Sequence, residues 1–148
     1  KVMKLNLLDR PLIPLADPDD ASVTYEKIRP YLLETDIVPL VVHVIEKAGG
    51  APDKASVEQR KEYAEKTFKQ FRDRAETDDI EVDTNILYET NVGEGIKTAA
   101  EEHDASAIVF RSRGGGRWID LVTGRVRSNL LHNNDQPVVV LPEREVES

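Results

Sequence analysis

The sequence contains no cysteine, and this absence excludes disulfides, thiol nucleophiles and zinc sites built on thiolates. Long apolar runs are also missing. Val38 to Ile45 is interrupted by His43 and is far shorter than the roughly 20 residues that a transmembrane helix needs. The first ten residues lack the apolar core of a secretory signal, so we expect a cytoplasmic protein. The three histidines match no metal-binding spacing, and no metal requirement is expected.

Basic residues are in the minority, with 20 lysines and arginines against 28 acidic residues and a net charge of -8. Such a charge disfavours binding to a phosphate backbone, so neither nucleic acid nor a membrane is an expected partner. Hydrophobic residues make up 39% of the 148 residues, and a chain of this length can bury one core of its own. We therefore expect a single domain over residues 1–148.

Strand-like apolar runs alternate with helix-like segments along the chain. The strands are expected at Leu12–Ala16, Pro39–Ile45, Val82–Leu87, Ala107–Phe110 and Pro137–Leu141. Four helices are expected between them, the last two at about Gly93–His103 and Gly124–His132. Alternation of this kind implies parallel pairing through right-handed crossovers. The predicted fold is therefore an α/β, Rossmann-like, doubly wound sheet of five parallel strands, with ligands expected beyond the carboxyl ends of the strands.

Helix boundaries can be proposed from capping residues. The first helix should begin near Asp19 or Asp20, either of which can cap it, and Pro30 should kink or shorten it. Ser56 and Gln59 form a capping box for the second helix. Its inward face is predicted to carry Val57, Ala64, Phe68, Phe71 and Ala75, and that of the third helix Ile96, Ala99 and Ala100.

The most informative segment is the loop FRSRGGGRWIDLVTGRVRSNLL after the fourth strand. Gly114 to Gly116 allow a close approach of backbone N–H groups to a ligand, and Gly124 precedes a helix whose N-terminus favours anions. Five arginines, at positions 111, 113, 117, 125 and 127, face one acid, Asp120, which gives the loop a local charge of +4 in an acidic chain. This concentration predicts a site for an anionic, phosphate-bearing ligand.

Two structural alternatives stay open for these charges. The arginines could pair with the abundant carboxylates or lie in solvent, in which case the cleft is filled by the protein itself. Asp17, Asp19 and Asp20 after the first strand could chelate Mg²⁺, or they could cap the helix and pair with Arg111 or Arg125.

The order of these segments resembles the universal stress protein family. LIPLADPDDAS resembles the family's first strand and loop, LVVHVIE its second strand, EHDASAIVFRSRG the approach to the glycine loop, and QPVVVLP its closing strand. The family's loop pattern is G-x-x-G-x9-G-[ST]. Gly114 and Gly124 match its second and third glycines with the nine intervening residues intact, whereas Arg111 replaces the first glycine and Arg125 the hydroxyl residue.

The resemblance implies strand order 3-2-1-4-5, a homodimer through the last strand at Val138 to Leu141, and ATP held by the loop in one branch of the family. The family's adenine-side aspartate falls on Ala16, with Asp17 one residue later. Arg111 would crowd a nucleotide, yet guanidinium groups bind phosphate well, so the expected ligands are ATP, AMP or phosphate. The candidate ligand-binding residues are Asp17, Val44, Phe110, Arg111, Ser112, Gly114, Gly124, Arg125, Val126 and Arg127.

The resulting functional prediction is a non-catalytic regulatory or sensor domain of the stress response, which binds a small anionic ligand and acts as a dimer. No catalytic residue is assigned. Two alternatives from other classes are a slow nucleotide hydrolase that uses Mg²⁺ on Asp17 or Asp19, and a structural adaptor whose cleft is closed by its own Arg–Asp pairs.

Overall fold

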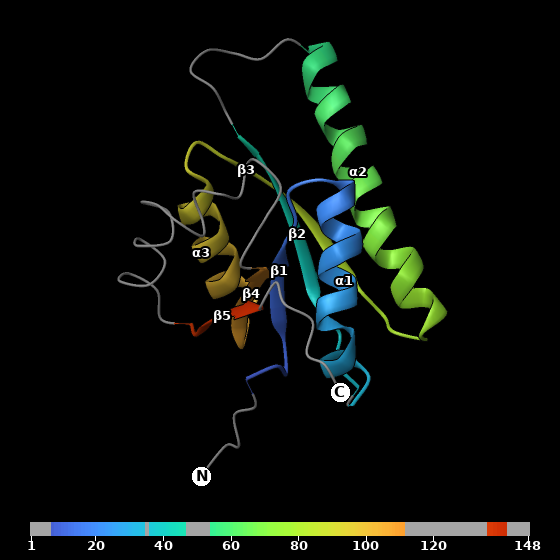
Figure 1. Cartoon of the computed structure of the whole chain (residues 1–148). Helices are drawn as coiled ribbons and strands as arrows, with labels where there is room; N and C mark the ends of the chain where they lie inside the picture. The colour runs from blue at the N-terminus through green and yellow to red at the C-terminus, as the bar shows by residue number, and fades with distance from the viewer. Residues whose placement is uncertain (1–6, 35, 47–53, 112–135, 142–148) are drawn as a thin grey trace.

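The computed structural model describes residues 7–34, 36–46, 54–111 and 136–141, and strands and helices alternate in it as far as residue 111 (Figure 1). The elements are β1 (Pro11–Pro14), α1 (Pro18–Leu32), β2 (Leu40–Glu46), α2 (Lys54–Thr77), β3 (Asp83–Glu89), α3 (Val92–Glu102), β4 (Ala107–Arg111) and β5 (Val138–Leu141). Each agrees with a predicted element to within a few residues. The fourth helix expected at about Gly124–His132 and the loop at 47–53 lie outside the described residues.

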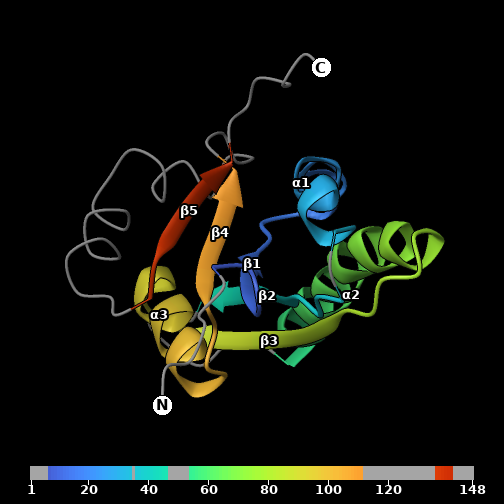
Figure 2. The same ribbon diagram turned by 90° about the horizontal axis from the view of Figure 1, so that it is seen from below.

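All strand pairs in the described sheet are parallel, in the order β3-β2-β1-β4-β5, which confirms the predicted topology. Helices α1 and α2 cover one face of the sheet and α3 covers the other (Figure 2). The chain moves outward from β1 to β2 and β3, then returns to the opposite side of β1 with β4. The strand order therefore reverses between β1 and β4, where sheets of this kind bind their ligands.

Two hydrophobic clusters hold the helices against the sheet. The cluster beneath α1 and α2 includes Ile13, Val41 and Phe68, and the cluster beneath α3 includes Leu12, Val42 and Ile96. The alternation of strand residues between the clusters follows from the two-residue period of a strand. The inward positions predicted for α2 and α3 are buried, except that Val57 is only partly buried.

Pro14 limits how far β1 can pair with β4. The N–H group of Leu15 donates to Val42 of β2 at 2.8 Å, and successive N–H groups of a strand point to opposite neighbours. Position 14 therefore faces β4, where proline has no N–H group to donate. The register of β1 with β4 covers only Pro11 and Leu12, so the two strands are unpaired towards their carboxyl ends.

The start of α1 differs from the prediction. The N-cap is Asp17, whose side chain accepts a hydrogen bond from the N–H group of Asp20 at 2.7 Å, and not Asp19 or Asp20. Pro18 explains the shift, because proline is favoured in the first turn and places the cap one residue before it. Pro30 lies inside α1 near its end, so the helix continues two residues beyond the predicted break.

The capping box predicted at the start of α2 is wrong. The helix already begins at Lys54, which places Ser56 inside the first turn, where its side chain cannot act as an N-cap. The start of α3 follows the usual rule instead. Asn91 caps this helix by accepting from the N–H group of Glu94 at 3.0 Å.

A cluster of three side chains joins the end of α2 to α1. Asp78 accepts hydrogen bonds from the hydroxyl of Tyr25 at 2.5 Å and from Nε and Nη2 of Arg29 at 2.8 and 3.0 Å. The Arg29 guanidinium, and then the Tyr25 hydroxyl, lower the pKa of Asp78 to about 2. Burial raises the pKa of Tyr25 above its usual value, and its hydrogen bond to Asp78 adds to this effect.

Candidate ligand-binding site

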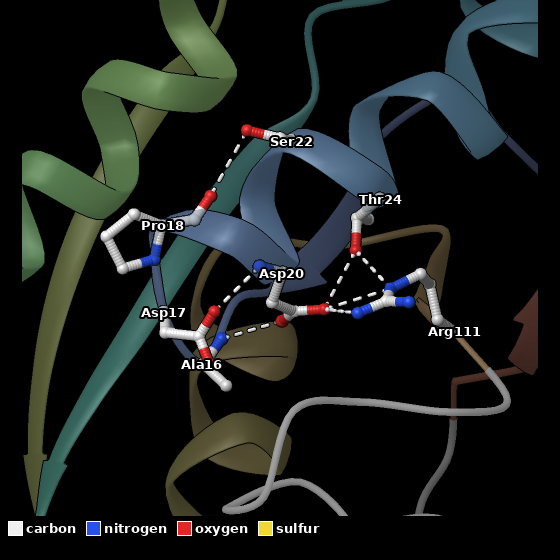
Figure 3. Close-up of polar contacts among 7 residues, drawn as sticks. All are labelled: Ala16, Asp17, Pro18, Asp20, Ser22, Thr24 and Arg111. Atoms are coloured by element: carbon white, nitrogen blue, oxygen red, sulfur yellow. Dashed lines mark hydrogen bonds and ion pairs between the residues drawn. The ribbon is translucent and has the colours of Figure 1, made fainter.

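Arg111 and Asp20 meet beyond the carboxyl ends of β1 and β4, where the two strands are unpaired. We call this place the opening between β1 and β4. Asp20 lies in the first turn of α1, directly after β1, and Arg111 is the last residue of β4 (Figure 3). The two residues are 91 positions apart in the chain. Their contact spans the place where the strand order reverses, so it lies where this fold is expected to hold a ligand.

The Asp20 carboxylate receives four hydrogen bonds. Its Oδ2 atom accepts from the backbone N–H group of Ala16 at 2.8 Å. Its Oδ1 atom accepts from the hydroxyl of Thr24 at 3.2 Å and from Nε and Nη2 of Arg111 at 3.0 and 2.7 Å. Ala16 is two residues beyond Pro14, so its N–H group points to the β4 side as well. The Asp20 side chain accepts from this N–H group in place of a β4 carbonyl and thereby connects β1 to β4.

Arg111 is largely covered, and its partner Asp20 is buried. Its side chain is 14% exposed and that of Asp20 is 5% exposed, and Arg111 Nε also donates to Thr24 Oγ1 at 3.2 Å. The structure therefore shows the pairing of Arg111 with the acidic loop that the sequence left open. A buried ion pair of this kind requires both members, because an unpaired buried charge is costly.

The other described candidate residues lie at the same end of the sheet but use their side chains differently. Asp17 is partly buried and caps α1. Val44 of β2 and Phe110 of β4 are 3% and 5% exposed and pack beneath α3. A ligand at this edge would therefore not contact their side chains. The remaining candidates, Ser112, Gly114, Gly124, Arg125, Val126 and Arg127, lie outside the described residues.

The acidic residues after β1 do not gather around a common point. Asp19 is exposed, Asp17 caps the helix, and Asp20 is covered by Arg111. Within the described part of the chain, no group of three or more histidine or acidic side chains could hold a metal ion. The described helices also include none that is long and apolar enough to cross a membrane.

Sequence reasoning did not identify Thr24 as part of this site. The available pattern was the spacing of Asp20 and Thr24, which at i and i+4 places both side chains on one face of a helix. Their burial, at 5% and 1% exposure, marks them as polar residues on the inward face of α1. A buried Asp and Thr at this spacing require a donor from another element, and Arg111 supplies it.

A hollow of about 300 Å³ lies between the carboxyl end of β2 and the start of α2. It is lined by His43, Ile45, Glu46, Ser56, Gln59, Arg60 and Tyr63. His43 is buried, with its Nδ1 atom 2.8 Å from the carbonyl oxygen of Leu15 and its ring 6.0 Å from that of Tyr63. His103 lies at the C-cap of α3.

Residues 12–142 match the family model described as the universal stress protein family. The match covers most of the chain and includes every described strand apart from the first residue of β1, so the chain belongs to this family. A comparison with curated protein sequences finds no match.

Solved structures of the family share this fold. A universal stress family protein from Burkholderia pseudomallei has a TM-score of 0.71 at 19% identity, covering 93% of this chain and 98% of its own. The protein from Archaeoglobus fulgidus in complex with dAMP has a TM-score of 0.63 at 17% identity, with 92% and 99% covered. A family protein from Arabidopsis thaliana with AMP bound has a TM-score of 0.64 at 13% identity, with 91% and 92% covered.

Proposed function

We propose that this protein is a non-catalytic universal stress domain that binds a nucleotide or another small phosphate-bearing ligand at the opening between β1 and β4. The observation that carries the proposal is the position of Arg111, a donor of charge-assisted hydrogen bonds at the carboxyl end of β4, at the point where the strand order reverses. The family members solved with dAMP and with AMP support the ligand class.

The proposed site combines the described residues Asp17 and Arg111 and the backbone of Val44 and Phe110 with the glycines and arginines of the following loop. In this arrangement Asp17 and the β2 backbone would contact the base side of a nucleotide, and the loop would contact its phosphate. The domain would act as a homodimer through β5 and report ligand occupancy to a partner in the stress response.

Isothermal titration calorimetry with AMP, dAMP, ATP and inorganic phosphate at low salt tests the binding proposal. Saturable binding of at least one of these ligands is the expected result, and a ligand-dependent rise in melting temperature should accompany it. Absence of binding to all four at millimolar concentration would refute a retained anion site.

The Arg111–Asp20 pair also favours a second candidate, a structural adaptor whose opening is filled by its own side chains. In that case the same titrations show no heat and no stabilisation, because the guanidinium already has its carboxylate. The two candidates therefore give opposite results in one experiment.

A further inference from the structure

The Asp20 carboxylate occupies the position in which a ligand's anionic group would meet Arg111. Its four hydrogen bonds come from Ala16 of the β1 end, Thr24 of α1 and two nitrogens of Arg111 (Figure 3). Asp20 could leave only by giving up the bonds to Ala16 and Thr24 as well. The carboxylate is thus a fixed part of the opening, and a ligand has to bind beside it.

The guanidinium group of Arg111 is only partly used by this contact. Asp20 holds the edge formed by Nε and Nη2, while Nη1 has no hydrogen-bond partner among the described residues. An arginine has five N–H donors, so hydrogen-bonding capacity remains after the pair has formed. Its charge, however, is cancelled at close range by Asp20.

We infer that Asp20 is a specificity-determining residue, which makes the opening selective for ligands with one phosphate group and against nucleoside triphosphates. The inference rests on the proposed function of the same site. A neutralised Arg111 can still donate to one oxygen, but each further negative charge on the ligand gains little from a cation that is paired with a carboxylate. A triphosphate would therefore lose the attraction that an unpaired arginine gives it.

The test compares AMP and ATP binding in two charge-matched variants. Asp20→Asn removes the carboxylate and leaves Arg111 unpaired, whereas Asp19→Asn removes the same formal charge from an exposed position one residue away. Binding is measured by calorimetry at fixed ionic strength without divalent cations. We expect Asp20→Asn to raise ATP affinity by about tenfold and AMP affinity by about threefold or less. Asp19→Asn should leave the ratio of ATP affinity to AMP affinity unchanged.

A double variant shows whether Arg111 is the cause. In Asp20→Asn with Arg111→Gln both charges are absent, so the ATP-to-AMP affinity ratio should return to the wild-type value. The double variant leaves no unpaired charge and should therefore fold. If Asp20→Asn alone does not fold, the wild-type ratio of ATP affinity to AMP affinity still tests the inference, because a tenfold preference for ATP contradicts it. Circular dichroism confirms that each variant used is folded.

The outcomes separate this inference from the proposed function. Wild-type protein that binds AMP at least as tightly as ATP, with the ratio shifted about threefold or more towards ATP in Asp20→Asn, supports both. Binding in the wild type with equal ratios in Asp20→Asn and Asp19→Asn overturns the role of Asp20 and leaves the proposed function standing. Wild-type protein that binds ATP ten times more tightly than AMP overturns the role of Asp20 without any variant. Absence of nucleotide binding in the wild type and in Asp20→Asn overturns both.

Discussion

At the scale of single residues, the pair formed by Arg111 and Asp20 should stabilise the fold in a way that depends on both members. Removal of the guanidinium in Arg111→Met leaves a carboxylate that is 5% exposed without its counter-charge. We expect this variant to lose about 3 to 5 kcal/mol of unfolding free energy, measured by urea denaturation. Adding Asp20→Asn should recover part of the loss, because the unpaired charge is then gone. A loss below about 1 kcal/mol in Arg111→Met would contradict the buried pair.

Asp78 should make stability depend on pH in the acid range. Its pKa is lowered to about 2 by Arg29 and Tyr25, below the ordinary value of 3.8, so its contribution is fully present above pH 4 and is lost as the pH falls towards 2. Asp78→Asn should therefore be less stable than the wild type at neutral pH, and this difference should shrink between pH 4 and pH 2. Thermal melts across this range measure it, with Asp36→Asn as an exposed control. A difference that is constant with pH would mean that the three hydrogen bonds to Asp78 do not depend on the charge of its carboxylate.

At the scale of elements, β5 is an edge strand whose free side could pair with a second copy of the chain. Its sequence, VVVL, is apolar, and Val140 is 44% exposed. Exposed apolar edges tend to associate, and a lysine on the edge prevents this. We expect light scattering to give a dimer mass for the wild type and a monomer mass for Val140→Lys. The matched control is Val23→Lys on α1, at 40% exposure, which should stay dimeric. A monomeric wild type at micromolar concentration would remove the proposed dimer.

The element boundaries show which features of the fold were accessible to sequence reasoning. The strands and the third helix could be predicted because their apolar periods are local signals, although the Asn91 cap was not identified. The start of α1 was misjudged because three aspartates near Pro18 could each cap it, and only the folded chain assigns Asp17 to the cap and turns Asp20 inward. The sequence suggested that Arg111 pairs with an aspartate after β1, but it could not determine which one, because Arg111 is 91 residues from Asp20 and two other aspartates lie nearby.

At the scale of the whole molecule, the arrangement of the acidic residues predicts that the protein binds a nucleotide without hydrolysing it. A hydrolase needs a metal ion or a group that orients water, and arginines alone supply neither. Asp17 caps α1 and Asp20 is covered by Arg111. We expect AMP affinity to be unchanged by EDTA, and phosphate release from MgATP to equal that of a heat-denatured control. Release above that level and lost in Asp17→Ala would instead favour the hydrolase alternative.

The central position of β1 also has a consequence for the order in which the molecule folds. This strand pairs with β2 at positions 40–42 and with β4 at positions 107 and 108, so one of its edges finds a partner early in the chain and the other very late. As the chain leaves the ribosome, the carboxylate of Asp20 remains in water until residue 111 has been made. Contacts of such long sequence separation slow folding, because the entropy of closing the loop has to be overcome first. The second edge of β1 and the charged site are therefore completed in the same late step, and a nascent chain that stops before β4 cannot contain the site.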